Sequence, residues 1–432
     1  MDAQAADKLK SLNTQASQPA QAVVGNAGLA QLAAGLDKDP NNLDNYFNYA
    51  HLAENAGKYP EAEKAYKHML EISPGLDRVK LDLALLYFKM GKVDQSKALF
   101  EEVRAKNIPD EVRKNIDTML AKLNDAMKRS HFSGLITTGS NMDTNANSAA
   151  SSGNNTISNV SIPLSPNSLS KRDANIFYAG VLNHSYRLSD LSNPNLGVTI
   201  ESNATLYQTD QLNYSAIDLQ IASVKTGPRF DIKEINTQVG FSGILTYVGL
   251  GHNPYIRSGG ESVDISHSFT KKFSIQNSTL HEYRTFLNSD QTSTYSQKSG
   301  EAYQNLTVLS YILNERNIVS SQIMFRKEDA RVALNASYQK QVSASYTHLF
   351  PKDYTGSASY SVKLYDYQDI DTSVSSTTLR HDDEHTLDIN CGKKLPRNVT
   401  ATVGYEYKYT DSTIENYKYA DNKATFALVW GF

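Results

Sequence analysis

Lys423-Ala-Thr-Phe-Ala-Leu-Val-Trp-Gly-Phe432, the last ten residues of the chain, decide the fold. In this stretch large apolar residues alternate with smaller residues, and the smaller residues become polar toward Lys423. A period of two indicates a β-strand with one apolar face, because successive side chains point to opposite sides of a sheet. Counted back from the carboxyl terminus, every second residue is apolar: Phe432, Trp430, Leu428, Phe426 and Ala424.

A strand of this kind fits either a soluble β-sandwich or a membrane-spanning β-barrel. A terminal Phe preceded by alternating aromatic residues resembles the closing strand of bacterial outer-membrane barrels. No run of apolar residues approaches the roughly 18 residues of a membrane helix. This criterion does not apply to barrel strands, because only alternate residues of such a strand face lipid. We therefore interpret four residues as a barrel-assembly signal: Phe426, Leu428, Trp430 and Phe432.

The composition narrows the classes of function. The 432 residues carry a net charge of −3, so no basic field predicts binding to nucleic acid. The single cysteine, Cys391, excludes an internal disulfide framework and a cysteine-based zinc site. The 26 tyrosines suit a membrane interface, because the ring is apolar and the hydroxyl is polar. Met1-Asp-Ala-Gln lacks the regions of a secretory signal, so we expect a mature chain, and residues 1–26 are expected to be a flexible leader.

Two segments after the leader match the spacing of a tetratricopeptide repeat. The first covers residues 43–74, and the second starts 34 residues later at Asp77 and carries Ser96 where Ala is usual. A final helix over residues 110–128 would cap the stack. Residues 27–128 are therefore predicted to form a helical repeat domain.

The predicted repeats offer a concave surface that could bind a peptide, by analogy with other proteins of this repeat class. For single residues such as Phe47, Leu81, Leu85 and Phe88, packing against neighbouring helices is the alternative. For the surface as a whole we favour binding. The predicted partner-binding residues are Asp44, Phe47, His51, Glu54, Asn55, Arg78, Leu81, Leu85, Phe88 and Lys89.

The helical pattern ends after Ser130, and fourteen segments of alternating polarity follow. Short turns and longer segments alternate between them, which is typical of a transmembrane barrel with short periplasmic turns and longer outer loops. Because fourteen is even, both ends of the predicted barrel, residues 131–432, face the periplasm. The predicted strands are 131–141, 173–189, 195–209, 213–231, 234–248, 255–270, 273–288, 298–313, 316–329, 335–350, 354–368, 383–394, 398–410 and 419–432.

The polar face of such a barrel lines its lumen. Mixed charge there disfavours export of a strongly anionic glycan. The first long loop, from Ser148 to Ser170, is rich in Ser and Asn and is expected to be mobile. The lumen candidates carry both signs of charge: Glu201, Lys363, Glu406, Lys408 and Lys423.

The sequence contains three polar constellations, and none predicts a catalytic or metal site. The imidazoles of His381 and His385 would stand about 13 Å apart on a strand, too far for one ion. Asp143-Thr-Asn-Ala-Asn147 resembles the start of a calcium loop but lacks the required Gly and distal Glu. Ser266 and His267 are adjacent on a strand and point to opposite faces. We expect no cofactor and no enzymatic activity, and we expect Cys391 to face lipid.

Tetratricopeptide repeats directly before a carboxy-terminal barrel resemble the surface lipoprotein assembly modulator family, called Slam. The resemblance covers about residues 30–432. It implies an outer-membrane translocon that helps to move lipoproteins or soluble haem-protein binders to the cell surface. The stretches that carry it are Leu83-Ala-Leu-Leu-Tyr87, Gly91, Ala98-Leu-Phe100, the helix from Val112 to Leu123, Phe132-Ser-Gly134 and Asp143-Thr-Asn-Ala-Asn147.

We therefore expect an α+β multidomain protein with helical repeats in the periplasm and an antiparallel barrel of about 14 strands in the outer membrane. By the resemblance, the barrel would be the conduit and the repeats would receive the client or its chaperone. Expected partners are a client lipoprotein or secreted haem- or metal-binding protein, the barrel-assembly machinery and outer-membrane lipid. The alternatives are a polysaccharide export porin or a passive diffusion porin with a periplasmic helical module.

Overall fold

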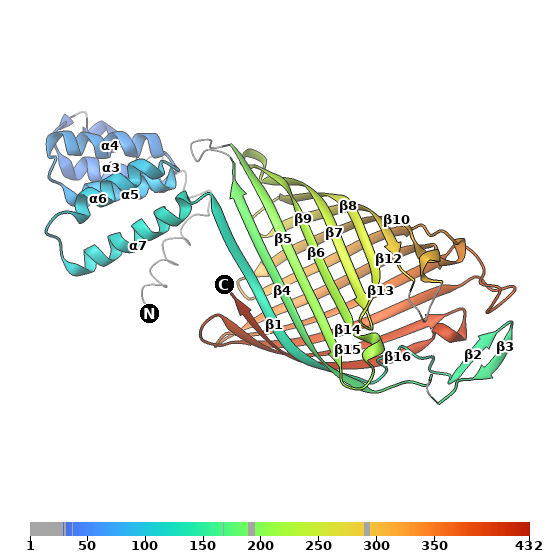
Figure 1. Cartoon of the computed structure of the whole chain (residues 1–432). Helices are drawn as coiled ribbons and strands as arrows, with labels where there is room; N and C mark the ends of the chain where they lie inside the picture. The colour runs from blue at the N-terminus through green and yellow to red at the C-terminus, as the bar shows by residue number, and fades with distance from the viewer. Residues whose placement is uncertain (1–28, 30–31, 37, 167, 189–194, 289–293) are drawn as a thin grey trace. The chain divides into compact units, whose positions relative to one another are not determined.

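The computed structural model describes the chain except for residues 1–28, 30–31, 37, 167, 189–194 and 289–293 (Figure 1). The expected leader, residues 1–26, lies outside the described residues. The described chain divides between Arg129 and Ser130 into a helical unit and a β unit. Among the described residues, no helix is both long enough and apolar enough to cross a membrane.

The helical unit consists of antiparallel helix pairs, as the repeat pattern predicted. Neighbours in sequence pack on one another, with contacts from α3 to α4, α4 to α5, α5 to α6 and α6 to α7. Gly57 and Gly91 follow the first helix of each pair with φ values of +74° and +73°, a conformation that residues with a Cβ rarely adopt. The helices are α3 (Leu43–Asn55), α4 (Tyr59–Ile72), α5 (Asp77–Lys89), α6 (Val93–Arg104) and α7 (Asp110–Met127).

Two clusters of buried side chains hold these helices together. The first joins α3, α4 and α5 around Tyr66 and Leu86, and the second joins α5, α6 and α7 around Phe100 and Leu123. Ser96, which stands where the repeat pattern has Ala, is fully buried. Its hydroxyl donates a hydrogen bond of 2.7 Å to the Ala84 carbonyl, so the extra polar atom is satisfied inside the core.

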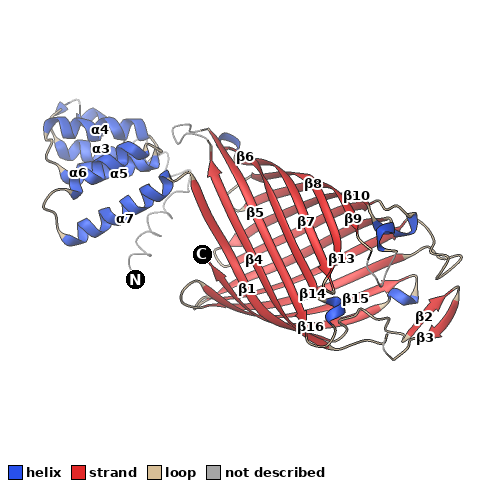
Figure 2. Cartoon of the chain, in the orientation of Figure 1, coloured by secondary structure: helices blue, strands red, loops and turns tan. Residues whose placement is uncertain are grey.

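The β unit is a closed antiparallel barrel of fourteen strands, which confirms the predicted fold class (Figure 2). Each strand pairs with its neighbours in sequence, and β1 pairs with β16 to close the sheet. The barrel strands are β1 (Ser130–Asp143), β4 (Asp173–Arg187), β5 (Leu196–Gln211), β6 (Leu219–Ile232), β7 (Thr237–Leu250), β8 (Asn253–Ser268), β9 (Phe273–Phe286), β10 (Gly300–Asn314), β11 (Asn317–Glu328), β12 (Ser337–Phe350), β13 (Tyr354–Tyr367), β14 (His381–Lys394), β15 (Val399–Ser412) and β16 (Tyr419–Gly431).

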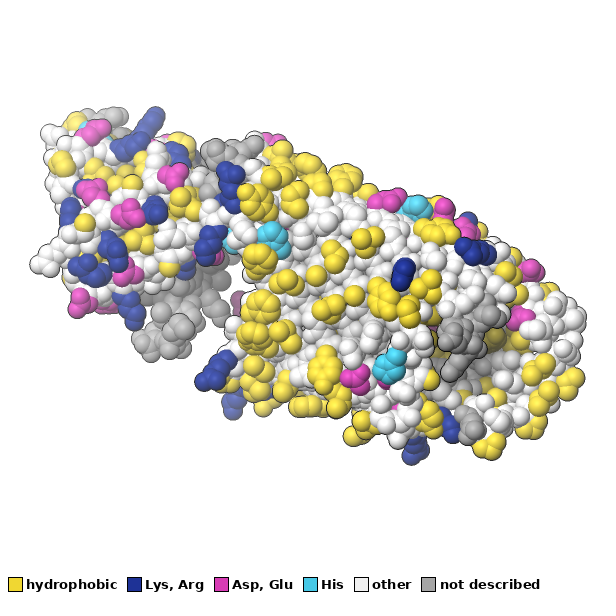
Figure 3. Space-filling view, in the orientation of Figure 1, with side chains coloured by type: hydrophobic (Ala, Val, Ile, Leu, Met, Phe, Trp, Pro, Cys, Tyr) yellow, Lys and Arg dark blue, Asp and Glu magenta, His cyan; other side chains and the backbone are white. Residues whose placement is uncertain are grey.

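Alternation along each strand separates an apolar outer face from a polar inner face. On the outer face of β15, Val403 and Tyr405 are 58% and 44% exposed. On the inner face of the same strand, Glu406 lies opposite Lys423 of β16. Apolar side chains are spread over the barrel face in view, with backbone and other side chains between them (Figure 3). This is the inverted arrangement of a membrane barrel, with lipid outside and polar groups within.

The predicted assembly signal lies on the outer face of β16, at the seam with β1. The backbone of Phe432 exchanges two hydrogen bonds with Gly134, with N···O distances of 3.0 and 3.1 Å. The Phe432 ring lies directly over Gly134, since a Cβ added there would come within 2.5 Å of the ring. The absence of a side chain at Gly134 therefore lets the terminal aromatic residue cover the end of the seam.

Most connections at one end of the barrel are shorter than those at the other end. At one end the turns are short, such as residues 315–316 and 351–353, and the chain also enters at Ser130 and leaves at Phe432 at this end. At the other end most connections are longer, but β7 and β8 are joined by residues 251–252 alone. The sequence pattern had predicted a longer outer segment there.

The first outer loop contains local structure that the sequence analysis did not predict. It contains a hairpin of β2 (Asn154–Ile157) and β3 (Val160–Pro163). The hairpin turn donates backbone hydrogen bonds from Ser158 and Asn159 to the carbonyls of Ser373 and Val374, at 3.0 and 2.9 Å. The sequence pattern does not reveal these contacts because they join segments more than 200 residues apart.

We predict that Gly134→Val weakens closure of the barrel, because an added Cβ would lie 2.5 Å from the Phe432 ring and 2.6 Å from the Val181 carbonyl oxygen. The folded band seen on unheated gels should convert to the unfolded band at a lower temperature than in the unsubstituted protein. Gly180→Val is the matched control, since Gly180 lies on the same outer face of β4 with no atom within 4 Å of an added Cβ. Equal melting of the two variants would contradict the close packing at Gly134.

Candidate functional site: the repeat surface and the barrel lumen

The ten predicted partner-binding residues lie on α3 and α5, the first helices of the two pairs. Asp44, Asn55, Arg78 and Lys89 are exposed, whereas the others are partly covered or lie at the margin of exposure. The structure brings several of them into contact across the two helices. Whether they bind a partner stays a prediction.

Charged side chains connect α3 with α5 across this surface. Lys89 Nζ lies 2.7 Å from Glu54 Oε1, and the Tyr66 hydroxyl donates to Glu54 Oε2 at 3.4 Å. The Glu54 side chain is only 10% exposed, so this ion pair is better shielded from water than a typical surface pair. Two predicted residues from successive repeats thus form one continuous polar patch.

Asp82, which the sequence analysis did not single out, lies at the base of the same patch. Its carboxylate is 3.1 Å from Arg78 Nε and 3.8 Å from His51 Nε2. Burial raises the pKa of the Asp82 carboxyl above its usual range, against the opposing effect of the Arg78 guanidinium and of His51. Only its i, i+4 spacing from Arg78 was visible in the sequence; the burial was not.

The apolar residues of the predicted surface divide into two groups. Leu85 and Phe88 are each 36% exposed, which leaves them available to another molecule. Phe47 packs against the first core cluster and Leu81 against the second, so packing explains these two residues. The surface that remains open is therefore a pair of apolar side chains on α5 next to the charged patch.

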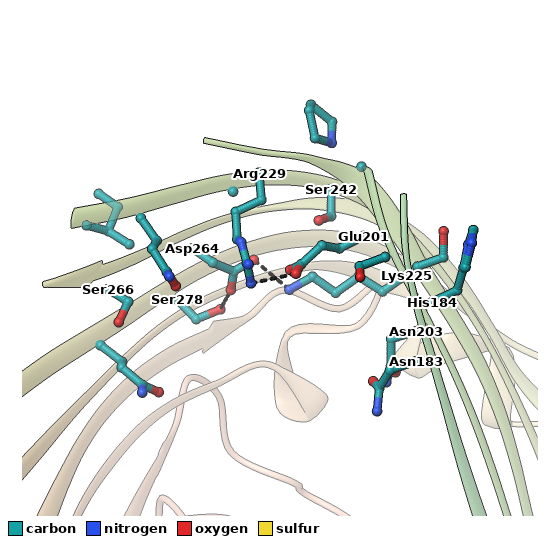
Figure 4. Close-up of a pocket in the computed structure, with 18 of the residues that line it drawn as sticks. Asn183, His184, Glu201, Asn203, Lys225, Arg229, Ser242, Asp264, Ser266 and Ser278 are labelled. Carbon is teal, nitrogen blue, oxygen red and sulfur yellow. Dashed lines mark hydrogen bonds and ion pairs between the residues drawn. The ribbon is translucent and has the colours of Figure 1, made fainter. Parts of the chain in front are cut away.

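The lumen wall of the barrel forms a recess of about 630 Å³ along β1 and β4 to β10 (Figure 4). Its charges are paired: Arg229 Nη1 lies 2.5 Å from Glu201 Oε1, and Lys225 Nζ lies 2.6 Å from Asp264 Oδ2. Ser278 donates a further hydrogen bond of 2.7 Å to Asp264 Oδ1. Figure 4 shows these side chains pointing into the barrel from adjacent strands.

Several further charges on the described lumen wall are paired in the same way. Arg326 lies 3.0 Å from Glu282 and 2.7 Å from Glu328. Lys408 lies 3.4 Å from Glu384, and Lys423 lies 2.7 Å from Glu406. The alternation of the strands places all five lumen candidates of the sequence analysis on the inner face, but their partners Arg229 and Glu384 depend on strand register, which the sequence does not reveal.

Two of the three polar constellations in the sequence have structural roles. His381 contacts Asp366 at 2.7 Å, while His385 accepts or donates a hydrogen bond of 2.8 Å with the Tyr360 hydroxyl instead. The segment of residues 143–147 anchors the first loop, because the backbone N–H of Asn145 and the Thr144 hydroxyl each donate to Asp421 Oδ1 at 2.9 Å. Among the described residues, no three His, Cys, Asp or Glu side chains are placed to hold a metal ion.

We predict that Asp82→Asn raises the unfolding midpoint of the helical unit at pH 7 by several degrees, measured in the full chain by circular dichroism. The folded-state pKa of Asp82 is raised, so its stabilising effect is complete below the unfolded-state pKa of about 4 and is lost as the pH rises through the folded-state pKa. The neutral amide of Asn has nearly the same shape and does not ionise, so the substituted protein does not lose this stability as the pH rises.

Asp94→Asn is the matched control, because Asp94 is exposed in the first turn of α6, where a negative charge favours the helix. Its midpoint at pH 7 should stay unchanged or fall. A lower midpoint for Asp82→Asn would show that the contacts with Arg78 and His51 outweigh the cost of burying the charge.

Comparison with known proteins identifies both units. Residues 55–113 and 33–64 match tetratricopeptide repeats, which confirms that part of the sequence analysis. No curated protein matches the chain. Among solved structures, the outer membrane channel DcaP of Acinetobacter baumannii is 10% identical, with 70% of this chain and 97% of that chain covered at a TM-score of 0.40. OpdQ of Pseudomonas aeruginosa is 9% identical, with 71% and 99% covered at a TM-score of 0.34.

The type III secretion translocator chaperone SycD of Yersinia enterocolitica is 15% identical, with 28% of this chain and 86% of that chain covered at a TM-score of 0.23. These TM-scores are too low to bear on function. The decisive match covers residues 136–432, nearly the whole barrel. A closed fourteen-strand barrel of this kind resides in the outer membrane, and the repeats are consistent with a periplasmic position. As the junction between repeats and barrel predicted, the chain belongs to the surface lipoprotein assembly modifier family.

Proposed function

We propose that this protein is an outer-membrane translocon that helps client proteins to reach the cell surface. The clients are lipoproteins or secreted haem- or metal-binding proteins. The helical repeats recruit the client in the periplasm, and the barrel serves as the conduit for its polypeptide. The bounds of the two parts, residues 27–128 and 131–432, follow the sequence analysis.

The observation that carries this proposal is the pairing of charges along the lumen wall. Lys225 with Asp264 and Lys423 with Glu406 are examples in which each charge is neutralised by a neighbour on the wall itself. A polypeptide carries charges of both signs, so a wall without a strong net charge neither traps nor repels it. A strongly anionic glycan would be expected to need a wall of biased charge.

The repeat surface supports recruitment. Leu85 and Phe88 supply apolar contact. Two ion pairs lie beside them, Lys89 with Glu54 and Arg78 with Asp82. Apolar anchors surrounded by charged groups are a common composition for a protein-binding surface. The family and fold are those of a transport and assembly barrel, and no residue is assigned a catalytic role.

We predict that the double charge reversal Arg78→Glu with Lys89→Glu lowers client delivery several-fold without changing barrel assembly. Both side chains are exposed beside the apolar pair on α5, and reversal places new negative charge next to Glu54 and Asp82. The readouts are the client on protease-treated intact cells and the folded band of the barrel on unheated gels.

Lys64→Glu with Lys114→Glu is the control, because both lysines are exposed on other helices, α4 and α7. The control should deliver the client normally. Normal delivery of the client by the Arg78→Glu, Lys89→Glu variant would show that the α5 surface does not bind the client.

The function itself is tested by expressing the chain in an outer-membrane-competent host together with the proteins encoded beside it. Protease added to intact cells then reports which of these proteins appears outside only when the chain is present. The proposal expects a lipoprotein or a secreted protein. Passage of small solutes or glycan without any surface protein would identify the barrel as a pore instead.

A further inference from the structure

The ladder of backbone hydrogen bonds between β6 and β7 is interrupted inside the barrel wall. Residues 219–226 of β6 pair with residues 243–250 of β7, and residues 229–232 pair with residues 237–240. The register is the same on both sides of the interruption, so no residue is inserted and the interruption is not a β-bulge. Pro228 lies at this point, and a proline has no N–H to donate to the facing strand.

Proline is rare in the interior of a sheet because it removes a ladder hydrogen bond. The sequence places two prolines in the barrel strands, and their positions differ. Pro254 is the second residue of β8, at the end of the barrel with longer loops, whereas Pro228 has paired residues of β6 on both sides. The missing donor therefore belongs to the interior of the wall.

The carbonyl of Phe241 is the acceptor that loses its donor, because Phe241 lies opposite Pro228 in the register of the flanking pairs. Its oxygen lies beside the place where a Cβ on Gly227 would be built, closer than any real Cβ could tolerate. A side chain at residue 227 would point into the lumen, as those of Lys225 and Arg229 do in Figure 4. The carbonyl oxygen is therefore turned toward the lumen and uses the room that the glycine leaves.

The displaced carbonyl lies at the lumen recess of about 630 Å³. Gly227, Pro228, Gly240 and Ser242 are among the residues that line this recess. Gly227 and Gly240 belong to the inner face, and neither adds a side chain over the wall beside the carbonyl. A glycine inside a strand is typical of a place where another backbone approaches closely.

A hydrogen-bond donor without a partner belongs to the same part of the recess. Arg229 Nη1 pairs with Glu201 at 2.5 Å, which leaves Nε of the same guanidinium. Among the described residues, this Nε is buried and has no hydrogen-bond partner. Arg229 pairs with Gly240, the residue before Phe241, so the donor and the acceptor come from facing positions of β6 and β7. Together they complement a peptide group, which offers one N–H and one C=O.

Water is the simplest occupant of a free acceptor in a polar recess. A client polypeptide that crosses the lumen would bring peptide N–H groups to the same acceptor, and in this respect the inference rests on the proposed function. An extended polypeptide supplies the donor and the acceptor at once, and the bare wall at Gly227 and Gly240 gives it access.

We propose that the Phe241 carbonyl and the glycine-lined wall beside it form a binding site in the lumen for the backbone of an extended polypeptide. A peptide N–H of the passing segment donates to the Phe241 carbonyl oxygen. The Arg229 guanidinium turns its Nε–H to a carbonyl of the same segment. The site contacts the backbone and no particular side chain, so it accepts clients of different sequence. No covalent bond is made or broken.

Pro228→Val tests the site, because it supplies the missing N–H without changing a side chain in the lumen. Residue 228 lies between the lumen-facing residues Gly227 and Arg229 and therefore faces lipid. The new N–H should draw the Phe241 carbonyl back into the ladder, and the folded band on unheated gels should convert at a higher temperature. Pro254→Val is the matched control, because it replaces the other strand proline of the barrel, away from the recess.

The probe is a short acetylated peptide of alternating Gly and Ser residues with a benzophenone at its centre. Light cross-links the probe to the purified full chain in detergent, and mass spectrometry locates the labelled fragments. We expect label on β6, β7 and β8, and about fivefold less label in Pro228→Val, as the loss of one hydrogen bond implies. The same peptide methylated at every backbone nitrogen should label the unsubstituted protein as weakly. Pro254→Val should be labelled like the unsubstituted protein.

Equal labelling of Pro228→Val and Pro254→Val, or no label in the recess of the unsubstituted protein, would overturn the site. Undiminished labelling by the methylated peptide would overturn it too, since that probe has no backbone N–H. An unchanged gel transition of Pro228→Val would show that the proline does not free the carbonyl, with the same consequence. The assay needs no client, so failure of the site is distinguishable from failure of client delivery.

Discussion

An open sheet edge inside a bilayer leaves backbone amides and carbonyls without hydrogen-bond partners, so the strands of this protein are stable in the membrane only when β1 meets β16. The register of that seam runs from Leu135 opposite Gly431 to Asp143 opposite Lys423. The backbone of Phe432 extends it to Gly134. Closure fixes which side of every strand faces lipid, and the chemistry of both barrel surfaces follows from it.

The inner surface is polar, and many of its charges lie in ion pairs. A charge that faces a narrow lumen is partly removed from water, and a partner on the next strand offsets that cost. Pairs such as Arg229 with Glu201 therefore stabilise the wall and at the same time leave little net field for a passing polypeptide. The outer surface is largely apolar, with polar side chains such as Ser202 and Thr226 paired by hydrogen bonds.

The alternation of polar and apolar residues was sufficient to predict all fourteen barrel strands and the face of each charged lumen candidate. Strand ends shifted by a few residues; β6, for example, begins at Leu219 rather than at residue 213. The repeat spacing likewise predicted α3 to α7. These features depend on local periodicity, which a single sequence displays directly.

The features that the sequence did not reveal depend on contacts between distant segments. The β2–β3 hairpin is short, and its attachment to Ser373 and Val374 follows from the shape of the barrel rim. The ion-pair partners in the lumen depend on register between strands, since Lys225 and Asp264 are 39 residues apart. The burial of Asp82 depends on how α3 packs against α5. None of these contacts leaves a periodic pattern.

The central claim is that the client polypeptide crosses through the lumen. Photoreactive residues placed at Ser361 and Val362 test it most directly, because these neighbours on β13 face the lumen and the lipid respectively. With a client stalled by a tightly folded carboxy-terminal domain, we expect cross-links to the client polypeptide from Ser361 and none from Val362. Cross-links from Val362 alone would contradict a lumenal route.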